Sequence, residues 1–198
     1  MGLDPVQLKL HPRWLPFYRS GLRYLLKPGS GEAGAPSEQG GGPRWSREAF
    51  LPRLERLSPP CSVLITYWDL CLDLLGLDRS EQGGQRRELF TRMLTGLDWP
   101  EQEYLFWPHS VCPDGEVVSD AELFWRGFWT AQPRYVLLFG ERAARTVVSS
   151  RGPGSHRVEL EGATCLVLPD PEEMLPDNRT AKNLVWRELK SLPVDSPS

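Results

Sequence analysis

The stretch RYVLLFGERAARTVV, residues 134–148, decides the fold. Its first half is a short apolar run that predicts a strand ending at Gly140, and its second half continues as a helix. Similar apolar runs occur on either side of it along the chain, and each predicts a strand: SVLIT at 62–66, YLFW at 104–107 and the second half of RVELEGATCLVLP at 157–169. Within the last stretch, Glu161 and Gly162 predict a turn between two extended runs.

Helical patterns separate these strands. Between the first two, apolar residues recur on one helical stripe at Leu89, Phe90, Met93, Leu94 and Leu97, with Arg86, Arg87 and Arg92 mostly outside it. Residues 119–130 predict a second helix, and Asp177 is expected to cap a last helix that runs to Leu192. Strands that alternate with helices predict an α/β fold with three layers, α/β/α, and a mostly parallel central sheet of about four strands.

The chain of 198 residues has the length of one domain with extensions. Residues 28–44 contain no large apolar side chain and predict a flexible Gly/Pro/Ser linker. We therefore expect an N-terminal docking segment at 1–27, the α/β domain at 45–192 and a disordered tail at 193–198.

The segment ahead of the linker combines aromatic and basic residues, which predicts that it docks on a surface. Two surfaces are open: its own domain, or another protein that it binds as an amphipathic anchor. The candidate partner-binding residues are Trp14, Phe17, Tyr18, Leu22, Tyr24 and Leu25. A membrane surface is disfavoured because the basic residues are scattered among the aromatic ones. With no recognisable signal peptide or spanning segment, a cytoplasmic location is expected.

Several classes of function find little support in the composition. The net charge of −3 gives no global reason to bind nucleic acid, so DNA contact would need a local basic patch, for which Arg142, Arg179 and Lys182 are the candidates. The four cysteines have no metal-ligand spacing and predict buried free thiols. No phosphate-binding loop and no nucleophilic triad is recognisable. We expect neither a metal nor a cofactor.

Two motifs resemble the uracil-DNA glycosylase superfamily. The first is QPRYVLLFGERAARTV, in which a buried strand ends near a glycine and small residues open a helix; the matching residues are Leu137, Leu138, Gly140, Ala143 and Ala144. The second is LVLPDPEEMLPDNRTAKNLVWREL, which is similar to the final loop and helix of the superfamily, with Lys182 and Trp186 at the expected places. The resemblance implies a glycosylase-like fold.

The same resemblance implies that the catalytic groups are degenerate. The first catalytic loop would lie at Tyr67–Asp69, where Asp69 retains a carboxylate but the glycine that admits a nucleotide is missing. The final loop has Asp170 where a histidine would stabilise the departing base, and an acid there raises the barrier. The base-reading position falls near Trp107 or Pro108, where no amide is available.

The psi subunits of bacterial DNA polymerase III, which have this fold without glycosylase activity, are a second resemblance. The matching stretches are Ser20–Pro28, Trp68-Asp69-Leu70, Phe106-Trp107-Pro108, and Asp170-Pro171 with Trp186. The resemblance implies a non-catalytic interaction protein in bacterial DNA replication or repair, with a clamp loader or another replication or repair subunit as partner. The alternatives are a divergent DNA glycosylase in which Asp69 positions water, and a binding module of unknown role on the same fold.

Overall fold

The structure, a computed structural model, describes residues 49–50, 54, 61–113, 115–148, 156–175 and 177–194. All of them belong to one compact unit, Gly41–Ser198. The predicted docking segment at 1–27 and linker at 28–44 lie outside the described residues. The packed domain continues through Val194, because Leu192 and Val194 are both buried.

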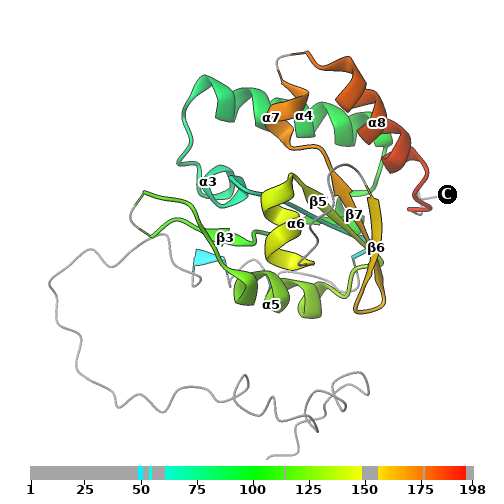
Figure 1. The fold of residues 1–198 in the computed structure, drawn as a ribbon, viewed down its shortest axis with the longest axis horizontal. Coiled ribbons are helices and arrows are strands. Elements are labelled where there is room, and N and C mark those ends of the chain that lie inside the picture. Colours follow the sequence, from blue (N-terminus) through cyan, green and yellow to red (C-terminus); the bar gives the residue numbers. More distant parts are fainter. Residues whose placement is uncertain are drawn as a thin grey trace, which may run out of the picture. The chain divides into compact units, whose positions relative to one another are not determined.

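The central sheet has the strand order β2-β1-β5-β7-β6 (Figure 1). β1 (Val63–Tyr67), β2 (Tyr104–Phe106), β5 (Tyr135–Phe139) and β7 (Ala163–Leu168) are parallel. β6 (His156–Leu160) is antiparallel to β7 and forms the hairpin expected at Glu161 and Gly162. The mostly parallel α/β sheet is therefore confirmed, with one antiparallel edge strand.

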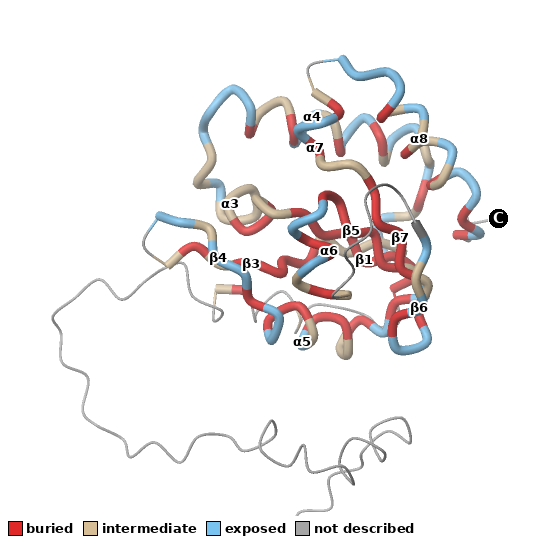
Figure 2. Tube along the Cα trace, viewed as in Figure 1, coloured by how far each residue is buried: buried red, intermediate tan, exposed pale blue. Residues whose placement is uncertain are grey.

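Helices cover both faces of this sheet, which gives three layers (Figure 1). On one face, α5 (Ala121–Ala131) and α6 (Glu141–Val147) pack on the side chains of Leu64, Val136 and Leu138. On the other face, α4 (Glu81–Leu97), α7 (Pro171–Met174) and α8 (Arg179–Lys190) pack on Ile65 and Leu137. Both faces of β1 and β5 are thus covered, as their continuous apolar sequences require (Figure 2).

Three local features differ from the sequence expectations. A short second sheet pairs β3 (Ser110–Val111) with β4 (Val118–Ser119), and no sequence pattern had predicted it. α8 is capped by the side chain of Asn178 rather than by Asp177. Arg86, placed outside the apolar stripe of α4, is in fact buried.

The remaining expectations about the interior agree with the structure. All four cysteines, Cys61, Cys71, Cys112 and Cys165, are free and buried. Burial raises the pKa of the Cys61 and Cys71 thiols to about 11, which makes them poor nucleophiles at neutral pH. A helix long and apolar enough to span a bilayer does not occur in the described part of the chain.

Candidate functional site

The carboxyl edge of the parallel strands is the first place where a ligand site is expected. Because β2 and β5 lie on opposite sides of β1, the strand order reverses there, and open α/β sheets bind ligands in the crevice outside such a reversal. Trp68 and Asp69 follow β1, Gly140 follows β5, and Asp170 follows β7. The sequence candidates Asp69 and Asp170 are thereby brought to the same edge.

The indole of Trp68 occupies the middle of this edge. Its ring contacts two side chains: the guanidinium carbon of Arg142 lies 5.2 Å from the ring centre, and the imidazole of His109 lies 5.8 Å away centre to centre. The backbone carbonyl of Trp68 also accepts a hydrogen bond of 2.7 Å from the Ser110 hydroxyl. A large half-buried side chain with two ring contacts thus lies where a ligand would enter.

His109 lies beneath Trp68 and is fully buried. Its Nδ1 is 2.8 Å from the hydroxyl oxygen of Thr66, and its Nε2 has no hydrogen-bond partner among the described residues. Burial lowers the pKa of His109 to about 4, so the ring is neutral at physiological pH. This histidine was not among the site residues predicted from the sequence, although its place just after a strand at the carboxyl edge was a usable signal.

The Asp69 carboxylate is shared with a buried ionic network. Arg86 reaches Asp69 at 3.5 Å, but it bonds more closely to Asp73 at 2.7 Å and to Asp78 at 2.7 Å. The hydroxyl of Tyr67 donates to Asp73 at 2.7 Å. Burial raises the pKa of Asp69 above its ordinary value despite the attraction of Arg86. Asp69 is therefore a partly exposed carboxylate held by a structural arginine.

The Asp170 carboxylate is hydrogen-bonded to the backbone around it. Its carboxylate accepts from the Glu172 amide at 3.0 Å and forms a capping box with Glu173 at the start of α7. A β-carbon on Gly140 would lie 2.3 Å from the Asp170 carboxylate, so this side chain covers the glycine directly. Burial raises the pKa of Asp170, and the carboxylates of Glu172, Glu173 and Asp69 raise it further. The edge is therefore acidic.

Trp107, the predicted base-reading position, follows β2 but does not present its side chain at this edge. Trp107 is fully buried in the core cluster that includes α5, and its indole N–H donates to the Leu123 carbonyl at 2.7 Å. The ring fills the space left by Gly127, where a β-carbon would lie 2.1 Å from the indole nitrogen. Pro108 is buried as well. Trp107 is thus a core residue with no free polar group.

The three candidate phosphate-binding cations fall into two groups. Arg142 lies on Trp68, as described above. Arg179 and Lys182 both belong to α8 and pair with Asp177, at 3.8 Å and 3.1 Å. Lys182 also borders a pocket between α4 and α8 that is lined by Met93, Met174 and other residues. Two of the three cations therefore share an acidic partner, which reduces their attraction for phosphate.

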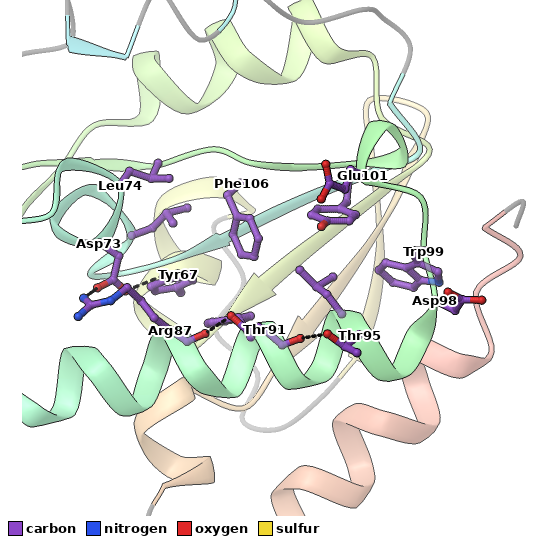
Figure 3. Close-up of a pocket in the computed structure, with 14 residues that line it drawn as sticks. Tyr67, Asp73, Leu74, Arg87, Thr91, Thr95, Asp98, Trp99, Glu101 and Phe106 are labelled. Carbon is purple, nitrogen blue, oxygen red and sulfur yellow. Dashed lines mark hydrogen bonds and ion pairs between the residues drawn. The ribbon is translucent and has the colours of Figure 1, made fainter. Parts of the chain in front are cut away.

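A larger cavity lies at the side of the sheet, between α4 and the edge strand β2 (Figure 3). This groove has a volume of about 670 Å³, which is the size of many ligand and peptide sites. Its wall along α4 runs from Arg87 to Asp98, or roughly 16 Å at 1.5 Å per residue. No sequence pattern had indicated it, since its two walls come from segments that look like ordinary core elements.

Aromatic rings form the apolar wall of the α4/β2 groove. Tyr104 meets Phe106 edge to face at 6.1 Å, Phe106 meets Phe90 in the same way at 5.5 Å, and Phe90 stacks on Tyr67 at 4.7 Å. On the α4 side the hydroxyls of Thr91 and Thr95 donate to the helix backbone four residues earlier, as Figure 3 shows. The groove therefore presents few free polar groups along its length.

Charge differs between the two ends of the groove. At one end Arg87 pairs with Asp73 at 2.8 Å, so that end is compensated. At the other end lie Asp98 and Glu101, both exposed, and no ion pair joins either to a cation of the described residues. The second end therefore carries a net negative charge.

The described residues contain no cluster of His, Cys, Asp or Glu side chains that could hold a metal ion. No protein-family model matches the chain, and a search of the curated proteins gives no match. The features that bear on function are therefore the α/β fold, the residues at its carboxyl edge and the α4/β2 groove.

Proposed function

We propose that this chain is a non-catalytic interaction protein of bacterial DNA replication or repair, a psi-like accessory subunit on a degenerate glycosylase-like domain. The observation that supports the absence of catalysis is the place of Trp68, which follows β1 at the carboxyl edge and contacts both Arg142 and His109 through its ring. A nucleotide would need that space. The replication or repair context rests on the resemblance of the sequence to the psi subunits and the glycosylases.

The charge at the same edge supports this proposal. Asp69, Asp170 and Glu172 interact with one another electrostatically, and each would repel a phosphate backbone or a departing base that carries negative charge. His109, whose ring contacts Trp68, is neutral and buried. Under the resemblance to the glycosylases, this edge would therefore offer acids and a buried neutral imidazole, which supports a non-catalytic role.

A divergent DNA glycosylase is the second candidate, and one observation favours it. Asp69 lies at the carboxyl end of β1, where the glycosylase resemblance puts the water-positioning group, and burial raises its pKa. Perturbed carboxylates occur frequently at catalytic sites. The competing explanation is the ion pair with Arg86, which gives Asp69 a structural partner.

Base release from oligonucleotides distinguishes the two candidates. The full chain is incubated with single- and double-stranded DNA that contains uracil, hypoxanthine or xanthine, and we expect no release of any base. Release that is abolished by Asp69→Asn would overturn the non-catalytic proposal and favour the glycosylase.

Co-purification tests the interaction role separately. The full chain and a chain that lacks residues 1–28 are used to capture partners under identical conditions. We expect the deletion to lose a specific replication or repair protein. An unchanged set of partners would remove the docking role of the N-terminal segment.

A further inference from the structure

The edge strand β2 has one side without a strand partner among the described residues. Within the described residues β2 pairs with β1 alone, which leaves it at the end of the sheet. The Trp107 amide donates to the Ile65 carbonyl at 3.0 Å, so the backbone groups of Trp107 point toward β1. Because successive residues of a strand point their backbone groups to opposite sides, those of Tyr104 and Phe106 point away from β1. Such outward N–H and C=O groups are a template for an added strand.

The α4/β2 groove lies where the side chains of that added strand would need cover. Tyr104 and Phe106 face the α4 side of the sheet, and the groove continues from them to the rim formed by Thr91 and Thr95 (Figure 3). Every second side chain of a strand next to β2 would point into this space. The aromatic wall favours bulky apolar side chains at those positions.

The uncompensated carboxylates determine the charge of the occupant. Asp98 and Glu101 lie together at one end of the groove, whereas Arg87 at the other end is already paired with Asp73. A basic side chain therefore gains attraction at the first end, and an acidic side chain finds no free cation at the second.

We propose that the α4/β2 groove binds an extended segment of a partner protein by strand addition to β2. The segment carries bulky apolar residues at alternate positions and Lys or Arg at the end that meets Asp98 and Glu101. This inference rests on the proposed interaction role and names the class of partner segment. It assigns the binding to a face of the domain that is separate from the closed carboxyl edge.

Selection from a random library of 12-residue peptides displayed on phage tests the proposal directly. The full chain is immobilised, and the enriched peptides are sequenced. We expect alternating bulky apolar residues with Lys or Arg at one end of the run. Enrichment of sequences with apolar residues at helical spacing, or of acidic sequences, would overturn the proposal, as would the absence of any enrichment.

Two variants of the protein test whether the peptide binds in the groove. Asp98→Asn combined with Glu101→Gln removes both charges with little change of shape, and Asn also tolerates the left-handed backbone of Asp98, whose φ is 53°. We expect a synthetic consensus peptide to bind this variant roughly two- to thirtyfold more weakly, with a smaller difference at high salt. Leu94→Glu, at the apolar wall, should abolish binding.

A matched control removes the same charge elsewhere. Glu116→Gln with Glu161→Gln alters two exposed carboxylates in the turns between β3 and β4 and between β6 and β7, and should bind the peptide like the wild type. Urea unfolding of every variant checks that the domain remains folded. Equal binding by the control and by the groove variants would overturn the proposal.

Two further measurements distinguish other outcomes: occupation of the groove by a second copy of the chain, and failure of the non-catalytic proposal rather than of this inference. Sedimentation of the full chain alone tests a second copy: a dimer that Leu94→Glu dissociates would show that the groove pairs two chains, against the proposal. The base-release assay is independent of these variants. Excision activity would refute the non-catalytic role, whereas groove variants that leave peptide binding intact would refute this inference alone.

Discussion

Replacement of Arg86 by methionine should destabilise the domain more than any other single charge removal in the described residues. The Arg86 side chain is 3% exposed and bonds to Asp73, whose side chain is 4% exposed, and to Asp78. Burial would lower the pKa of Arg86, but its hydrogen bonds to Asp73 and Asp78 raise it above the ordinary value. The guanidinium is therefore charged at every pH at which the protein folds.

The magnitude follows from what Arg86→Met leaves behind. Methionine fills a similar volume, so the main loss is electrostatic: Asp73 keeps only the Tyr67 hydroxyl and the partly exposed Arg87 as partners. Removal of one member of a buried ion pair costs about 3–5 kcal/mol, because the other charge remains buried and uncompensated. For a domain of this size, that corresponds to a decrease in Tm of roughly 6–20 °C.

Urea denaturation of the wild type, Arg86→Met, Asp73→Leu and the double variant measures this energy as a double-mutant cycle. We expect the double variant to recover most of the loss, since it leaves neither charge of the closest pair buried alone. Arg92→Met is the control, because Arg92 is 78% exposed and pairs with Glu88 on the same helix. A loss below about 1 kcal/mol for Arg86→Met would refute the electrostatic reasoning.

Three further results are expected. Gly127→Ala should lower the free energy of unfolding by about 1–3 kcal/mol, because the added methyl group would clash with Trp107. Gly84→Ala lies in open space on α4 and should raise the free energy of unfolding by about 0.5–1 kcal/mol. Equal stability of the two variants in urea would contradict the packing of Trp107 on Gly127. As pH falls from 6.5 to 4, the unfolded His109 binds a proton that the folded one resists, so stability should decrease by about 3 kcal/mol more in the wild type than in His109→Gln. Trp68→Ala should uncover His109 and raise its pKa from about 4 toward 6.5 in an NMR titration; an unchanged pKa would show that Trp68 is not its cover.

The sheet could be predicted because its signals are local. A run such as YVLLF has no polar position, and a strand covered on both faces is the structure that tolerates this. The turn at Glu161 and Gly162 was also predictable, because a glycine between two extended runs favours a turn, and both residues adopt positive φ in the structure. The β3–β4 pair was missed because strands of two residues leave no periodicity to detect.

Burial of Arg86 could not be predicted from the pattern of α4. A helical stripe assigns arginine to the solvent side, and its partners Asp73 and Asp78 precede the helix in segments with no pattern of their own. The position of Trp107 was missed for a similar reason. Whether the residue after a strand faces the carboxyl edge or the core depends on space elsewhere, here the space above Gly127 in α5.

The two edges of the sheet differ in whether their side chains already have contact partners, and this difference bears on where a ligand or partner could bind. At the carboxyl edge, Trp68, Asp170 and Arg86 each make specific internal contacts, so entry of a ligand there would have to break several of them. At the β2 edge, the outward backbone groups and the Asp98 and Glu101 carboxylates can gain partners without loss of any contact among the described residues. Since an interaction that breaks nothing retains more of its binding energy, the β2 edge is the better place for a partner to bind.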